Sequence, residues 1–97
     1  MKIYLAGPIT GTENYIDQFQ KAANHFAKQG HIVLNPAVLP DGLGDCDQYM
    51  HVCLPMIDLA DAVVMLPGWR DSRGACREWG YAMALDKIVM EYEEDTP

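Results

Sequence analysis

Basic residues are scarce in this chain of 97 residues, which carries 7 Lys and Arg against 14 Asp and Glu and has a formal net charge of -7 at pH 7. Proteins that bind a nucleic-acid backbone cluster Lys and Arg side chains so that they displace its counterions. The composition therefore argues against a nucleic-acid partner. Small molecules remain as candidate ligands.

The sequence also has few cysteines and no long apolar run. Its 3 cysteines are an odd number without a C-x-x-C pair, so we expect free thiols and no disulfide framework. Cysteines and histidines lack the spacing of zinc ligands, and we expect neither a metal nor a cofactor. No segment approaches the ~20 apolar residues of a membrane span, and the first apolar run is too short for a signal peptide. We expect a cytoplasmic protein without a membrane partner.

The length fits one small domain, which we place at residues 1–92, followed by an acidic tail over residues 93–97. A domain of this size buries roughly two thirds or less of its surface on folding. We therefore expect it to self-associate as a homodimer or a higher homo-oligomer.

Short apolar segments alternate with helical patterns along the chain. We expect strands over residues 2–6, 31–35, 61–66 and 87–91 and helices over about residues 14–29, 47–59 and 73–86. Pro55 should kink or break the second helix, and residues 37–47 should be irregular. The alternation predicts a three-layer α/β fold, flavodoxin-like or Rossmann-like, with a parallel sheet of four to five strands.

Ligands of such sheets bind beyond the carboxyl ends of the strands, near a switch in strand order. This rule selects the loops over residues 7–12, 35–39 and 67–74. In the last loop, Asp71-Ser72-Arg73-Gly74 precedes a helix, where backbone N–H groups and the positive end of the helix dipole form an anion site in outline. An ordinary helix N-cap explains these residues equally well.

Glu78 follows this loop within the first two turns of the predicted helix. At about 100° per residue, one side of the helix collects Ala75, Trp79, Ala82 and Asp86. Glu78 falls at the edge of this stripe and should be partly buried. Such a carboxylate suits a nucleophile or an electrostatic stabiliser, but in isolation a first-turn Glu paired with Arg73 or Arg77 is the simpler interpretation.

Two aromatic residues are open to two interpretations each. Trp69 could stack on the base of a ligand, although closing a loop over the core is the commoner role. Tyr4 could present its hydroxyl to the site, although the pattern alone favours a core position.

The combined segments Lys2–Gly11, Gly30–Pro36, Asp61-Ala62 with Leu66–Trp69, and Ser72–Ala75 with Glu78 cover nearly the whole chain. Together they resemble the short phage and bacterial branch of the nucleoside 2-deoxyribosyltransferase-like superfamily. The resemblance implies that Glu78 attacks the anomeric carbon of a deoxyribose and that Tyr4 sets this carboxylate. It implies phosphate or sugar contacts from Gly7, Pro8, Thr10, Gly11, Pro36, Gly68, Trp69, Ser72, Arg73 and Gly74.

The resemblance also implies an Asp on the preceding helix that works near the sugar and the leaving base. This sequence departs from that pattern, since Cys53 stands at the position. Asp47, Asp58 and Asp71 are the other carboxylates available, and we take Asp71 or Asp58 as the candidate acid.

The leading hypothesis is an enzyme that cleaves or transfers the N-glycosidic bond of a deoxynucleoside or its 5′-monophosphate. Cys53 motivates an alternative, a catalytically inactive module that binds a nucleotide or an ADP-ribose-like ligand. A third hypothesis is an interaction protein whose helices serve only as an oligomer surface.

Overall fold

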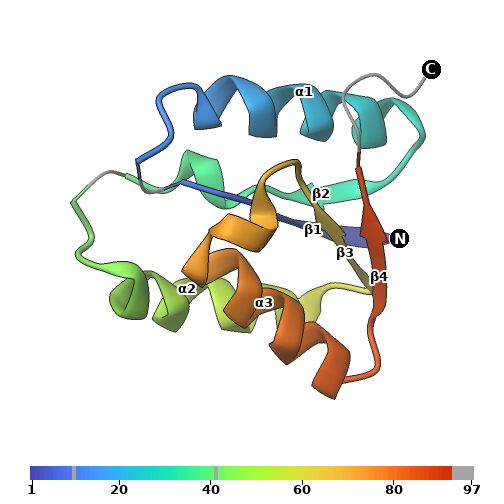
Figure 1. The fold of residues 1–97 in the computed structure, drawn as a ribbon. Coiled ribbons are helices and arrows are strands. Elements are labelled where there is room, and N and C mark those ends of the chain that lie inside the picture. The colour runs from blue at the N-terminus through green and yellow to red at the C-terminus, as the bar shows by residue number, and fades with distance from the viewer. Residues whose placement is uncertain (10, 41, 93–97) are drawn as a thin grey trace.

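The computed structural model describes residues 1–9, 11–40 and 42–92, and the side chain of Cys46 is left out. Thr10 and the acidic tail therefore lie outside the described residues. The elements run in the order β1 (Lys2–Ala6), α1 (Tyr15–Lys28), β2 (Ile32–Leu34), the 3-10 helix η1 (Pro36–Val38), α2 (Cys46–Leu59), β3 (Ala62–Met65), the 3-10 helix η2 (Trp69–Asp71), α3 (Arg73–Ala84) and β4 (Ile88–Glu91) (Figure 1).

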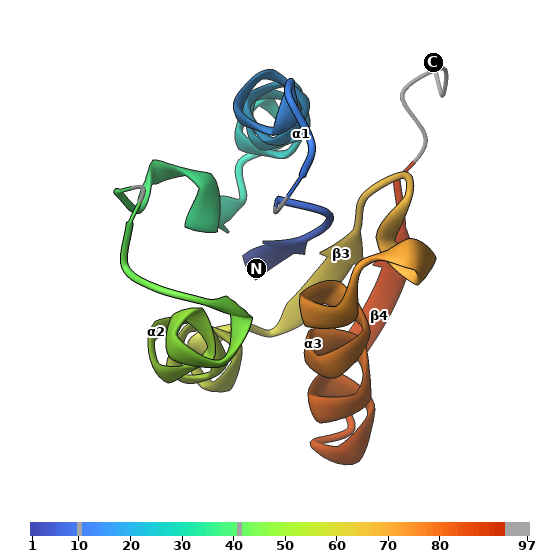
Figure 2. The same cartoon turned by 60° about the vertical axis from the view of Figure 1, so that its left-hand side comes forward.

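Four parallel strands form one sheet in the order β2-β1-β3-β4. Helix α1 covers one face of the sheet, and α2 and α3 lie side by side on the other (Figure 2). The expected three-layer fold with a flavodoxin-like parallel sheet is confirmed. No helix within the described ranges has both the length and the apolar character needed to span a membrane.

Alternation along the central strands divides the core into two layers. Ile3 and Leu5 of β1 pack with Phe19 in the cluster under α1. Tyr4 and Ala6 point the other way, into the cluster under α2 and α3. Because side chains of a strand alternate between faces, the register of β1 decides that Tyr4 faces the two-helix layer.

Helix α2 differs from the prediction in two ways. It begins at Cys46, inside the stretch expected to be irregular, because Asp45 and Gln48 form a capping box there. It also continues through Pro55, so the expected break is wrong. Proline removes one backbone hydrogen bond, but Cys53 and Ile57 on either side of it are buried in the core, and their packing holds the helix together.

The remaining boundaries agree with the prediction to within a few residues. Helix α1 ends before Gly30, which has a φ of 90° and so adopts the left-handed conformation that terminates a helix. Cys76 is a free cysteine, as expected, and Cys53 is buried. Self-association stays a prediction, since the structure contains one chain.

Candidate active site

A cavity of about 430 Å³ opens at the carboxyl ends of β1 and β3. The chain moves from β1 to β2 on one side and later crosses to β3 on the other, so the strand order switches between β1 and β3. Open parallel sheets bind ligands at such a switch point. The cavity wall comes from the loop after β1, the N-terminal part of α2, and the segment that joins η2 to α3.

Glu78 is the charged side chain that the described part of the chain buries, with 5% of its surface exposed, and it lines the cavity. Its place follows from the start of α3, where the Ser72 hydroxyl accepts a hydrogen bond of 3.2 Å from the backbone N–H of Ala75. From this cap, helical spacing turns Ala75, Glu78 and Ala82 toward the core. Among the ion pairs of the described residues, none joins Glu78 to Arg73 or Arg77. Arg77 instead forms an ion pair with Asp47.

The predicted position of Glu78 at the edge of the buried stripe is wrong. Glu78 lies in the stripe, whereas Trp79, predicted there, is 39% exposed. Trp79 stacks on Trp69 at the surface, with 5.9 Å between ring centroids. A carboxyl group can occupy the inner position because a buried partner meets it there.

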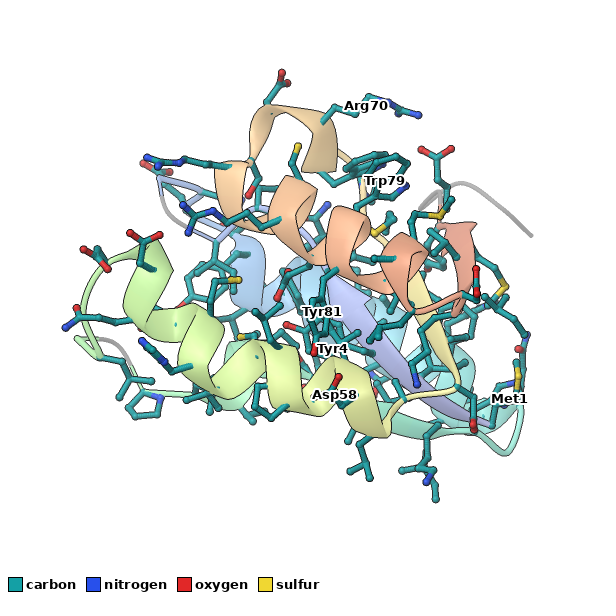
Figure 3. The ribbon with its side chains drawn as sticks, turned by 90° about the horizontal axis from the view of Figure 1, so that it is seen from below. Met1, Tyr4, Asp58, Arg70, Trp79 and Tyr81 are labelled. Atoms are coloured by element: carbon teal, nitrogen blue, oxygen red, sulfur yellow. The ribbon has the colours of Figure 1, made fainter. Side chains whose placement is uncertain are left out.

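That partner is Tyr4, whose hydroxyl donates a hydrogen bond to Oε2 of Glu78. Tyr4 is fully buried in the middle of β1, and its side chain lies between α2 and α3 (Figure 3). The bond joins residues 74 positions apart in the sequence and links the sheet to α3. Of the two interpretations of Tyr4, the structure combines both, since the residue is in the core and its hydroxyl reaches the site.

Cys53, on α2, is a further buried residue at this cavity. Its side chain is 3% exposed and lines the cavity together with Glu78. As a close neighbour of both groups, the thiol lowers the pKa of Glu78 and raises the pKa of Tyr4. A strand and two helices thus converge on one buried carboxyl group.

Burial sets the protonation of this cluster. Loss of solvation raises the pKa of Glu78 to about 7, against the opposing effect of the hydrogen bonds from Tyr4 and Cys53. Burial, followed by the nearby Glu78 carboxylate, raises the pKa of Tyr4 well above its ordinary value. At neutral pH Tyr4 therefore keeps its proton as a donor, while Glu78 is present both as the acid and as the carboxylate.

A known protein family matches nearly the whole chain. The family described as "Domain of unknown function (DUF4406)" matches residues 1–91. This chain belongs to the DUF4406 family. No protein with curated annotation matches this DUF4406 domain significantly.

One solved structure similar to the DUF4406 domain is the 2-desoxiribosyltransferase from Leishmania mexicana, with a TM-score of 0.72 and 23% sequence identity. The similarity covers 98% of this chain and 65% of that protein, so the domain spans about two thirds of its length. The DUF4406 domain has a nucleoside deoxyribosyltransferase-like fold, which confirms the resemblance seen in the sequence.

The structure brings only part of the predicted contact residues to the cavity. Gly7, Ser72, Arg73 and Gly74 line it. Outside this lining lie Pro8, Gly11, Pro36, Gly68 and Trp69. Thr10 is outside the described residues. The predicted contact residues that line the cavity thus come from the position directly after β1 and from the start of α3.

Trp69 closes its loop over the core, the commoner of its two expected roles. It is 9% exposed, and its indole N–H donates a hydrogen bond of 3.0 Å to Oε1 of Glu91. The Arg70 guanidinium lies 4.6 Å from the centre of its ring and also pairs with Glu91 at 3.0 Å. These contacts tie η2 to β4 and so support the loop that leads into α3.

The two candidate acids lie in different places. Asp71 is exposed and lines the cavity. Asp58 lies near the far end of α2, where its carboxylate accepts a hydrogen bond of 2.6 Å from the Tyr81 hydroxyl (Figure 3). The structure therefore brings Asp71, and not Asp58, to the same cavity as Glu78.

The sequence analysis missed the contribution of the start of α2. Gly44, Asp45, Tyr49 and Met50 line the cavity from this side. Gly44 has a φ of 127°, a backbone conformation that residues with a side chain rarely adopt, so glycine is favoured here. The pattern Asp45-x-x-Gln48 is a capping-box signal and would have predicted a helix start at Cys46.

The cavity shows no ready metal site. In the described part of the chain, no three His, Cys, Asp or Glu side chains come together in a group that could hold a metal ion.

Proposed function

We propose that this DUF4406 domain cleaves or transfers the N-glycosidic bond of a deoxynucleoside or a deoxynucleoside 5′-monophosphate. The observation that carries the proposal is the buried Glu78 carboxyl group, which lines the cavity and accepts a hydrogen bond from the Tyr4 hydroxyl. The deoxyribosyltransferase-like fold supports the same reaction class.

In the proposed reaction, a carboxylate oxygen of Glu78 bonds to the anomeric carbon of the sugar as the bond from that carbon to the base breaks. The electrons of that bond leave with the base, which then takes up a proton. Positive charge builds on the sugar as the base leaves, and the buried carboxylate stabilises it before forming the ester. Water or a second base then attacks the anomeric carbon and releases Glu78.

Tyr4 and the start of α3 have separate roles in this proposal. The Tyr4 hydroxyl bonds to Oε2 of Glu78 and holds the plane of the carboxylate for attack. Ser72, Arg73 and Gly74 line the cavity at the N-terminus of α3, where backbone N–H groups suit a phosphate or a sugar hydroxyl. Asp71, on the same wall, is the proposed proton donor for the leaving base.

The test is release of free base from a panel of deoxynucleosides and their 5′-monophosphates, separated by chromatography, with and without a second base as acceptor. Glu78→Gln should lower release by roughly 10³-fold or more, because an amide is a far weaker nucleophile than a carboxylate. Glu13→Gln, which changes an exposed Glu before α1, serves as the control. Unchanged turnover in Glu78→Gln would contradict the role of Glu78.

Cys53 in the cavity wall favours one second candidate, a nucleotide-binding module without catalysis. The same panel distinguishes the two functions when thermal unfolding is measured beside base release. A ligand-induced rise in the unfolding temperature of the parent protein without any free base favours the binding module.

A further inference from the structure

The reaction proposed above uses Glu78 and Tyr4 but leaves Cys53, the third buried member of their cluster, without a role. Cys53 and Tyr4 pack in the same core cluster, and Cys53 and Glu78 line the same cavity. The Cys53 thiol also lowers the pKa of Glu78 and raises the pKa of Tyr4, as a close polar neighbour does.

The position of Cys53 is determined by how α2 is held. The capping box at Asp45 sets where the helix begins, and Ile57, four residues after Cys53, is fully buried in the same core cluster. Residues four positions apart share one face of a helix, so the burial of Ile57 also turns Cys53 inward.

Two polar contacts connect α2 to α3 on either side of Cys53 in the sequence. Asp47 pairs with Arg77, the residue before Glu78, and Asp58 accepts a hydrogen bond from Tyr81, three residues after Glu78. The two helices therefore have a defined register. This register brings the Cys53 thiol and the Glu78 carboxyl group together.

We propose that Cys53 is a positioning residue, whose thiol donates a hydrogen bond to the Glu78 carboxylate from α2 while the Tyr4 hydroxyl donates from β1. The carboxylate is then held by two donors from different elements. The effect of the Cys53 hydrogen bond on turnover rests on the proposed function, because this bond matters for turnover only where Glu78 is the nucleophile.

A thiol suits this position for an electrostatic reason. A carboxylate here would place a second negative charge beside Glu78 in a buried cluster, where like charges disfavour each other's ionisation. An apolar side chain would fill the space but donate nothing. A thiol supplies a donor without a charge, and its weak bond leaves the carboxylate reactive.

The ionisation of Glu78 reports on this bond. The titratable and charged groups that line the cavity with Glu78 and Cys53 are Asp45, Tyr49, Asp71 and Arg73, and Tyr4 faces Glu78 from β1. Of these groups, Tyr4 and Cys53 are the hydrogen-bonding partners of Glu78 that affect its pKa, and both lower it. Loss of the thiol donor should therefore move the titration of Glu78 to higher pH.

The experiment is a titration of the protein labelled with ¹³C at the Glu side-chain carboxyl, followed by NMR, with Glu78 assigned from the signal missing in Glu78→Gln. Cys53→Ala should raise the midpoint of Glu78 by roughly 0.5 to 1 pH unit, the size expected for one lost hydrogen bond. Cys53→Ser, which keeps a donor, should stay within about 0.3 pH unit of the parent. Where Cys53→Ala does not fold, Cys53→Val removes the donor with less loss of volume and should show the same rise.

Cys76→Ala is the matched control, because the Cys76 thiol contacts the backbone oxygens of Trp69 and Arg70. An unchanged midpoint in Cys53→Ala or Cys53→Val would overturn the proposal. A midpoint in Cys53→Ser as high as that of Cys53→Ala would overturn it too, because packing and not the donor would then be responsible.

The titration needs no substrate, so its outcome is independent of the proposed reaction. Where the parent releases free base, the pH profile of release should move to higher pH in Cys53→Ala by the same amount as the NMR midpoint. A parent that releases no base contradicts the proposed function, whereas the shift of the Glu78 midpoint still decides whether Cys53 is the second donor.

Discussion

Replacing Glu78 by glutamine should stabilise the folded domain at alkaline pH and have little effect at acidic pH. Burial raises the pKa of Glu78 to about 7 from an ordinary value of 4.5. A carboxyl group whose pKa is raised by folding favours the folded state below its unfolded pKa, and this contribution is lost as the pH rises through the folded pKa. Ionised Glu78 therefore destabilises the domain, and the uncharged amide of glutamine does not.

The magnitude follows from the same two values. At about 1.4 kcal/mol per pKa unit, the rise from 4.5 to about 7 corresponds to about 3 kcal/mol of folding free energy between pH 4.5 and pH 8. This is a large part of the roughly 5–15 kcal/mol that stabilises a typical domain. The cavity thus holds its carboxylate at a measurable cost to stability.

The assay is urea unfolding of the parent and of Glu78→Gln at pH 5 and at pH 8.5, at one ionic strength, followed by the fluorescence of Trp69 and Trp79. The variant should exceed the parent by about 3 kcal/mol at pH 8.5 and by less than about 1 kcal/mol at pH 5. Glu13→Gln, which makes the same substitution at an exposed position, is the matched control variant. An equal difference between the variant and the parent at both pH values would refute the reasoning.

Two further predictions concern the cavity wall. Asp71→Asn should lower base release by roughly 100-fold, because the proposed proton donor is lost. Asp58→Asn, which changes the Tyr81 contact away from the cavity, should have a far smaller effect on release. Equal losses in the two variants would contradict the placement of the acid. Gly7→Ala should destabilise the fold by about 1–3 kcal/mol in thermal or urea unfolding. The reason is that its Cβ would lie 2.9 Å from Cβ of Leu66 and 3.3 Å from Cζ of Phe19. An unchanged unfolding midpoint would show that these neighbours move aside at no cost.

The strands and helices could be predicted because their signals are local. The apolar run before Pro67 reads as a strand buried on both faces, and β3 is buried throughout. The start of α2 also has a local signal, the capping box of Asp45 and Gln48, but the passage of the helix through Pro55 has none. Packing of Cys53 and Ile57 against the sheet overrides the local effect of the proline there.

Glu78 shows where helical periodicity reaches its limit as a guide to burial. When the buried face of the helix is predicted from its apolar residues, the large apolar Trp79 falls on that face and Glu78 falls at its edge. The structure reverses the two residues, because the Tyr4 hydroxyl satisfies the carboxyl group inside and Trp69 stacks on Trp79 outside. Neither partner is a neighbour in the sequence.

The sequence by itself determined the alternation of strands and helices, the parallel sheet, and the loop and helix that carry Glu78, since these depend on periodicity and turn residues within short segments. The resemblance in the sequence pointed to Tyr4 as its partner, but only the tertiary structure decided how Tyr4 and the other side chains meet that carboxylate. The register of β1 places Tyr4 on the two-helix face, and the docking of α2 against α3 brings Cys53 and Asp45 to the cavity. Contacts between such distant segments come from packing, and for that reason Cys53 becomes a neighbour of Glu78 only in the folded domain.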